Sequence, residues 1–264
     1  MRIFFIKRRS LVITSVVSFS LTLGIGLAQA YPTKPIRLIA PFPAGDATGS
    51  LARALSQKLS EKLGQTLVVE NLPKAGGTVR ADTASKSLTD GCRPLLATGS
   101  TQSIELAISP KIPYSAETDP TPIGSETSLP NVVVEPNTLS VKSMHKLIDY
   151  ARENLGELGY APNDNGTVVR LTTEHFKAQS DTFILRTPYR GTALAIPDLV
   201  SDKVGLLFNS IVTVMPCVKG GKLRALAVTS VKRSALAPGI PTVPETLSGF
   251  ESVTWFGLSG PMNL

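Results

Sequence analysis

A loop near the start of the chain places one acidic side chain among small residues. The segment 41–50 reads PFPAGDATGS and lies directly before a stretch with helical spacing. The first turn of a helix carries backbone N–H groups without intrahelical acceptors and a partial positive charge. Such a loop can therefore hold a phosphate, a sulfate or a carboxylate. An ordinary surface turn is the alternative, because Gly and Pro are common in turns.

A second segment has the same form. Asn165, Gly166 and Thr167 precede a helix-like stretch at 168–179. If both helix starts face one cleft, their N–H groups converge on the same space. That arrangement favours an anion site over two unrelated turns.

Regular elements must position these loops. Apolar runs at 36–40 and 67–69 flank a stretch in which leucine recurs every fourth residue. This pattern predicts a strand, a helix and a second strand. We expect Thr48 or Ser50 to cap the helix at its start and Gly64 to end it in a left-handed turn.

The same alternation continues to the end of the chain. Short apolar runs, most of them separated by helical segments, predict further strands at 94–98, 131–135, 158–161, 183–186, 204–208, 223–229 and 253–258. Units of this length predict an α/β fold in which parallel sheets are covered on both faces by helices.

Prolines divide the chain into two expected lobes. Those between residues 108 and 136 exclude a continuous helix and predict an extended crossing. We expect a discontinuous lobe 1 comprising residues 31–105 and 231–264, and a lobe 2 spanning 106–230. A second proline-rich tract precedes the last strand, which returns toward lobe 1.

Residues 1–30 have the composition of an export signal. A basic start is followed by the apolar run 11–27 and by Ala28-Gln29-Ala30, a small-x-small cleavage pattern. We expect cleavage after Ala30 and a periplasmic protein. The alternative is an uncleaved membrane anchor, for which the apolar run is barely long enough. Removing four basic residues lowers the net charge of +7 to +3, and no basic run with interleaved aromatics remains. No nucleic-acid partner is expected.

The chain contains two cysteines and two histidines. Cys92 and Cys217 fall in different predicted lobes, so we interpret them as small apolar side chains rather than as a disulfide. His145 and His175 lie in separate amphipathic stretches without metal-ligand spacing, which is typical of solvated helix residues. We expect no metal and no cofactor. The common hydrolase, metalloprotease and nucleotide-binding motifs are absent, so an enzyme is not expected.

A series of short motifs is informative through its order and spacing. The motifs are Tyr31-Pro32, Lys34–Leu38, Pro41–Gly45, Val69–Asn71, Ala75–Gly77, Thr98–Thr101, Asn165–Thr167, Pro188–Gly191, Gly221–Ser230 and Trp255–Leu258. Together they closely resemble the Bug (TctC-like) family of periplasmic solute receptors of tripartite tricarboxylate transport systems. The resemblance implies a two-lobed, type II periplasmic-binding fold that closes over a small carboxylate, such as a dicarboxylate, a tricarboxylate or an acidic amino acid.

The resemblance also implies a set of ligand-binding residues. In this set neutral N–H and O–H donors grip an anion, and ordered water can complete the network. Packing in the core is an equally good interpretation of Phe42 and Tyr189. The implied residues are Phe42, Ala44, Gly45, Asp46, Ala47, Thr48, Ser100, Thr101, Asn165, Gly166, Thr167, Tyr189, Gly191, Thr192 and Asn209.

Three features depart from the family pattern. The acid of the family loop lies three places further along, so Asp46 is closer to the cleft and would repel a bound carboxylate by about 1 to 4 kcal/mol. If Asp46 instead caps the helix and faces solvent, it would not repel the ligand. Asn209 and Arg170 replace a usual acid and a usual histidine. The family also continues past the Trp-Phe-Gly segment, which implies that lobe 1 is incomplete here.

These observations predict an extracytoplasmic receptor that captures a small carboxylate for a tripartite tricarboxylate-type transporter. The expected partners are the carboxylate and the membrane permease subunits, and the expected state is a monomer. A ligand-responsive periplasmic partner of a membrane sensor and a non-functional truncated product are the alternatives.

Overall fold

The computed structural model describes residues 31–71, 77–109, 112–115, 118–161, 166–187, 189 and 192–264. The chain divides into two compact units, Met1–Thr33 and Lys34–Leu264. Only residues 31–33 of the first unit are described, so the predicted signal peptide lies outside the described residues. The helices and strands discussed below all belong to the second unit.

The first-lobe part of the sheet forms around three parallel strands. β1 (Ile36–Ala40) pairs in parallel with β2 (Leu67–Asn71) and with β3 (Leu95–Thr98). The predicted leucine helix is α2 (Ala47–Leu63), and Gly64 ends it in the left-handed conformation as expected. The apolar faces of α2 and the strands meet in one core cluster that includes Leu38, Ala52, Leu96 and Phe256.

Short helices complete this lobe. They are α3 (Thr78–Ser85), the π-helix η3 (Ser100–Ile104) and α4 (Glu105–Ile108). A second core cluster joins α3 to β1 and β3 through Ile39, Ala81, Ala84 and Leu95, and Tyr114 packs against it.

The remaining helices pack around the other end of the sheet, which we call the second lobe. Strands β7 (Leu207–Ser210) and β8 (Leu223–Val228) lie beside the end of β4 (Thr121–Pro136), while β5 (Gly159–Tyr160) and β6 (Leu185–Arg186) form a small parallel pair. The helices are α5 (Met144–Glu153), α6 (Val168–Ser180), α7 (Thr192–Val200), α8 (Ile211–Lys219) and the 3₁₀ helix η4 (Val243–Glu245). Two core clusters fill the space around these strands.

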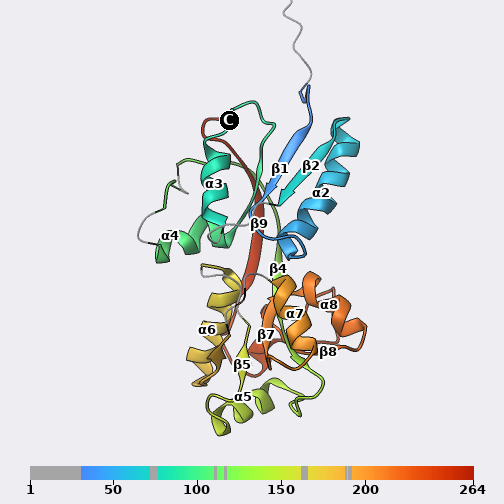
Figure 1. Cartoon of the computed structure of the whole chain (residues 1–264), viewed down its shortest axis with the longest axis vertical. Helices are drawn as coiled ribbons and strands as arrows, with labels where there is room; N and C mark the ends of the chain where they lie inside the picture. Colours follow the sequence, from blue (N-terminus) through green and yellow to red (C-terminus); the bar gives the residue numbers. More distant parts are fainter. Residues whose placement is uncertain are drawn as a thin grey trace, which may run out of the picture. The chain divides into compact units, whose positions relative to one another are not determined.

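Two long strands run between the lobes (Figure 1). β4 pairs antiparallel with β9 (Val253–Gly260) from Thr121 opposite Gly260 to Pro130 opposite Val253. β9 also pairs antiparallel with β3, and β4 continues into antiparallel pairing with β7 and β8. The resulting strand order is β2-β1-β3-β9-β4-β7, with β8 also paired to β4.

The expected strands are confirmed, but the expectation of parallel sheets is wrong. The sheet is mixed, because β4 and β9 cross between the lobes as extended chain and enter without the helical crossover that parallel neighbours require. The lobe boundaries stay a prediction. Val243 and Phe250, which those boundaries assign to lobe 1, pack in the cluster that contains Phe176 and Phe208 of lobe 2.

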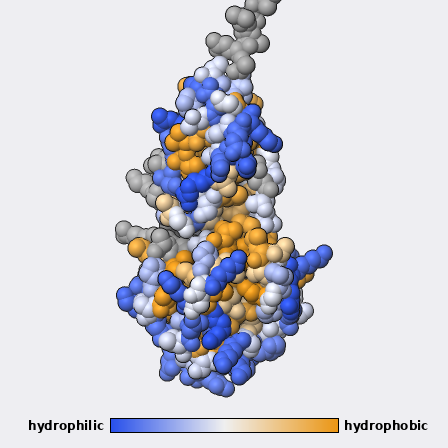
Figure 2. All heavy atoms as spheres, turned by 90° about the vertical axis from the view of Figure 1, so that its right-hand side faces the viewer, coloured by the Kyte–Doolittle hydropathy of each residue, from blue (hydrophilic) through white to orange (hydrophobic). Residues whose placement is uncertain are grey.

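Apolar residues also reach the surface. Figure 2 shows apolar patches among hydrophilic residues on the side of the molecule that carries α2, α7 and α8. Leu194, Val200 and Val212 are exposed large apolar side chains of α7 and α8. Within the described residues, no helix has both the length and the apolar character needed to cross a bilayer.

A buried ion pair joins β4 to β8 in the second lobe. Glu135 is fully buried, and its Oε1 accepts a hydrogen bond of 2.9 Å from Nη1 of Arg224. The same Nη1 donates to the carbonyls of Leu139 and Val141, while Oε2 of Glu135 has no partner among the described residues. Burial raises the pKa of Glu135 to about 7, although Arg224 opposes that rise.

Replacing Arg224 with Met should therefore destabilise the fold in a pH-dependent way. At pH 8 the variant leaves a buried carboxylate without its cation, and we expect a loss of about 3 kcal/mol or more in the free energy of unfolding. At pH 5 Glu135 takes up a proton and the loss should shrink. Denaturant unfolding at both pH values measures this loss in the free energy of unfolding. The control is Arg233→Met, which breaks the exposed pair with Glu245 and should change little; equal losses at pH 5 and pH 8 would contradict the prediction.

Candidate functional site

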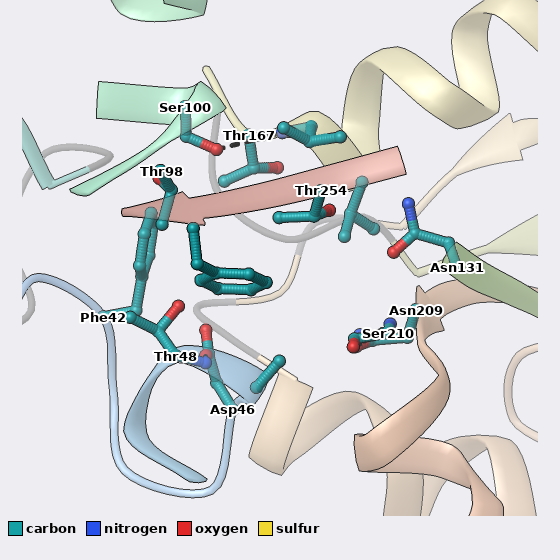
Figure 3. Close-up of a pocket in the computed structure, with 14 residues that line it drawn as sticks. Phe42, Asp46, Thr48, Thr98, Ser100, Asn131, Thr167, Asn209, Ser210 and Thr254 are labelled. Carbon is teal, nitrogen blue, oxygen red and sulfur yellow. Dashed lines mark hydrogen bonds between the residues drawn. The ribbon is translucent and has the colours of Figure 1, made fainter. Parts of the chain in front are cut away.

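A pocket lined by both polar and apolar side chains lies where the starts of α2 and α6 approach β4, β7 and β9. It encloses about 410 Å³ of space, a figure that includes solvent at its open mouth. Residues from both lobes and from the crossing strands line it (Figure 3). They are Phe42, Asp46, Ala47, Thr48, Thr98, Ser100, Asn131, Thr167, Val168, Val169, Asn209, Ser210, Thr254 and Phe256.

Three helices begin at this pocket. Ala47 is the first residue of α2, Val168 of α6, and Ser210 directly precedes α8; Ala47, Val168 and Ser210 all line it. Helix starts carry N–H groups that need acceptors and a partial positive charge. The pocket therefore attracts negative charge, although Asp46 is the only ionisable side chain among its described lining residues.

Asp46 itself accepts a hydrogen bond from one of these helix starts. It is the N-cap of α2, and its Oδ1 accepts a hydrogen bond of 2.6 Å from the N–H of Thr48. The expectation that Thr48 or Ser50 caps this helix is wrong, because the helix begins at Ala47 and both residues lie inside its first turn. Asp46 therefore has both of the expected roles. It caps the helix, and its half-buried side chain lines the pocket.

Burial gives Asp46 an unusual protonation equilibrium. It raises the pKa of this carboxyl to about 6, against the opposing effect of the hydrogen bonds from Thr48 and Gly49. A carboxylate that repels a bound anion at neutral pH is thus close to neutral in mildly acidic solution.

Contacts across the pocket hold α6 against the first lobe. The Val168 N–H donates to Oγ of Ser100 at 3.1 Å. Gly166, with a φ of 77°, lies so close to Glu105 that a Cβ at this position would stand 1.6 Å from its Oε1. A side chain at position 166 would therefore meet both backbone strain and a buried carboxyl group.

The structure brings together about half of the residues predicted to bind ligand. Phe42, Asp46, Ala47, Thr48, Ser100, Thr167 and Asn209 line the pocket. Ala44 and Gly45 are exposed on the loop and lie outside the lining.

The remaining predicted residues serve other contacts or lie outside the described part. The Thr101 hydroxyl turns back to the Thr98 carbonyl at 3.1 Å, and the Tyr189 hydroxyl donates to Asp198 at 2.9 Å. Gly166 contacts Glu105, as described above. Asn165 and Gly191 are outside the described residues, and Thr192 is described only as the first residue of α7.

Several pocket residues carry no local signal in the sequence. Asn131 lies within β4, Thr254 and Phe256 lie on β9, and Ser210 ends β7. Each sits in an apolar or mixed run that resembles any half-buried strand. Thr98, which directly precedes the Gly-Ser-Thr turn, and Val168 and Ser210, which directly follow the predicted Thr167 and Asn209, could have been included from their positions alone.

The structure also places the two cysteines and the two histidines. Cys92 and Cys217 are both free, with Cys92 buried and Cys217 half-buried. His145 and His175 are exposed on α5 and α6, as expected for solvated helix residues, and the ring of His175 stacks on Phe250. The described residues include no cluster of three or more potential metal ligands.

Asp46 should make the stability of the fold fall as the pH rises. The folded state holds the Asp46 proton up to about pH 6, whereas the unfolded chain releases it near 3.8. Between these values the folded state binds more protons, so the free energy of unfolding decreases with increasing pH. Asp46→Asn keeps a good N-cap and removes the titration. We expect this variant to gain stability relative to the parent from pH 4 to pH 7 in denaturant titrations; a constant difference across this range would contradict the assignment.

Comparisons with known proteins identify the family of the chain. A model of the tripartite tricarboxylate transporter family receptor, TctC, matches residues 51–263. Protein BugT of Bordetella pertussis is 34% identical over 248 residues, which cover 92% of this chain and 76% of BugT.

Solved structures are similar over most of the chain. R. palustris Rpa4515, determined with adipate, superposes with a TM-score of 0.85 at 31% identity over 88% of this chain and 78% of its own. The periplasmic binding protein BugD gives a TM-score of 0.83 at 29% identity, with the same coverage of both chains. The mixed α/β fold with helix-covered sheets is that of periplasmic binding proteins, and the chain belongs to the TctC family of tripartite tricarboxylate transporter receptors.

Proposed function

We propose that this protein captures a small carboxylate at the pocket between its lobes and delivers it to the permease subunits of a tripartite tricarboxylate-type transporter. The observation that carries the proposal is the convergence of the α2, α6 and α8 starts on one pocket. Helix amides bind anions without a cationic side chain.

The lining supports a carboxylate over a larger or apolar ligand. Hydroxyl groups of Thr48, Thr98, Ser100, Thr167 and Thr254 surround the helix starts. Such groups donate hydrogen bonds to carboxylate oxygens, and ordered water can bridge the longer gaps. Rpa4515, at 31% identity, was determined with the dicarboxylate adipate, which is consistent with this ligand class.

Binding rather than turnover fits the chemistry of the lining. The family is one of receptors, and the described lining residues include no histidine, cysteine or lysine. Asp46 is the only carboxylate among them, and its hydrogen bond from the Thr48 N–H caps α2, which fits a structural role better than that of a base that activates a serine or threonine hydroxyl.

A thermal-shift screen tests the proposal directly. A ligand that binds only the folded state raises the melting temperature, so at least one di- or tricarboxylate of a panel should do so, with the matched diamides as controls. If calorimetric titration also detects no binding of any carboxylate, the proposed ligand class is wrong.

Asp46 should tune this binding through its charge. We expect Asp46→Asn to tighten binding of the preferred dicarboxylate at pH 8 by about tenfold or more, equivalent to about 1.4 kcal/mol. Near pH 5 the gain should be much smaller, because the parent Asp46 is then largely protonated. The ratio of the two affinities at each pH removes the ligand's own titration. Asp202→Asn, an exposed change in a turn, is the charge-matched control. A ratio near one at both pH values would show that Asp46 acts only as a helix cap, and an equal gain at both would show that its charge is not the cause.

Export is the second part of the proposal, because the signal peptide rests on sequence alone. Expressed with its own leader in a Gram-negative host, the protein should reach the periplasm with Tyr31 as its first residue. N-terminal sequencing of the periplasmic fraction measures this. A cytoplasmic product that retains Met1 would refute export by this leader.

A further inference from the structure

Asn131 and Ser210 form a polar pair at the second-lobe side of the pocket. They stand opposite each other in the register of β4 and β7, so their side chains are neighbours on one face of the sheet. Asn131 is 0% exposed and Ser210 is 4% exposed. Both line the pocket, and Figure 3 shows them projecting toward it from their strands.

A hydrogen-bond chain fixes the orientation of the Asn131 amide. Thr172 has a single hydroxyl proton, which it can donate to the Val168 carbonyl at 2.8 Å. The hydroxyls of Thr172 and Ser252 are also in contact, and either can be the donor. Whichever acceptor takes the Thr172 proton, the Thr172 oxygen accepts from Asn131, whose Nδ2 lies 3.4 Å away. The NH₂ group of Asn131 therefore points toward α6, and its oxygen is left for the pocket.

That oxygen has no donor within the described part of the chain. Oδ1 of Asn131 is buried and without a hydrogen-bond partner there, and the same holds for Oγ of Ser210. Ser210 is the N-cap residue of α8, yet its side chain makes no capping bond. Buried polar atoms in folded proteins are nearly always paired with protein groups, ordered water or a ligand, so two neighbouring unpaired ones in a pocket mark a place that a water or a ligand group can fill.

The chemistry of the pair defines that group. Asn131 offers an acceptor, and the Ser210 hydroxyl both donates and accepts. An alcohol O–H matches this combination, because it donates to one partner and accepts from the other. An ammonium group could donate to both oxygens, but its charge would have no anionic side chain on β4 or β7 beside the pair, because Asp46, the only carboxylate of the described lining, caps α2.

We propose that Asn131 and Ser210 form an uncharged subsite that receives a hydroxyl group of the ligand, so that the receptor selects hydroxylated carboxylates over their deoxy analogues. This inference rests on the proposed carboxylate-binding function and deepens it. Thr172 acts as a positioning residue, because it holds the amide of Asn131 with the acceptor facing the pocket.

Calorimetric titration with paired ligands tests the subsite. The pairs are malate with succinate and 2-hydroxyglutarate with glutarate, both enantiomers of each hydroxy acid being used, and aspartate supplies the ammonium analogue. For the pair that binds, one hydroxy acid should bind the parent protein about tenfold or more tighter than its deoxy partner. Asn131→Ala and Ser210→Ala should each reduce that ratio to about threefold or less, because the affinity for the hydroxy acid falls more than the affinity for the deoxy acid.

Two further variants separate positioning from general structural effects. Thr172→Val should lower the same ratio by releasing the amide, whereas a purely structural role would weaken both ligands of a pair equally. Thr213→Val removes a hydroxyl that is also buried and unpaired among the described residues but lies outside the pocket lining, and it should leave the ratio unchanged. If Asn131→Ala fails to fold, Ser210→Ala and Thr172→Val carry the test.

The possible failures are distinct. If deoxy acids bind as tightly as hydroxy acids, or if aspartate binds more tightly than malate, the hydroxyl subsite is wrong while the carboxylate receptor stands. If no carboxylate of the panel binds, the proposed function and this inference both fall.

Discussion

Strand β4 belongs to both lobes. Its first part pairs with β9, and its last residues pair with β7 and β8. Backbone hydrogen bonds fix the register of both pairings. They therefore fix the position of the first-lobe loops relative to the second-lobe loops that face them. The starts of α2, α6 and α8 therefore meet at one pocket, and every property of the site depends on this shared strand.

Each helix start at the pocket needs an acceptor, and the chain supplies a side-chain acceptor for α2 and α6 but not for α8. Asp46 supplies it for α2 from within the chain. Ser100 of the first lobe supplies it for the first amide of α6, which also ties the lobes together. The side chain of Ser210 leaves the start of α8 uncapped. The second-lobe side of the pocket therefore has more unsatisfied hydrogen-bond donors and acceptors than the first-lobe side. A ligand can satisfy them.

Much of the fold could be predicted from local pattern. The leucine spacing over α2, the apolar runs of β1 to β3 and the glycine at position 64 each act through neighbouring residues, so they are visible in sequence. The direction of β9 was not visible, because the same apolar run fits a parallel or an antiparallel neighbour. The capping residue of α2 was misplaced by local reasoning, since Asp, Thr and Ser all cap helices well.

The sequence by itself determined the α/β class, the loop at 41–50 as an anion-binding candidate, and Asp46 as its anomalous residue, because these features arise within one short segment. Only the tertiary structure decided that Asn131 and Ser210 share the pocket and that the Tyr189 hydroxyl is used elsewhere. The physical reason is that the hydrogen bonds of a buried polar group depend on residues far away in the chain. The partner that orients Asn131 is Thr172, on a different element, and no spacing rule connects a strand residue to a helix residue across a folded core.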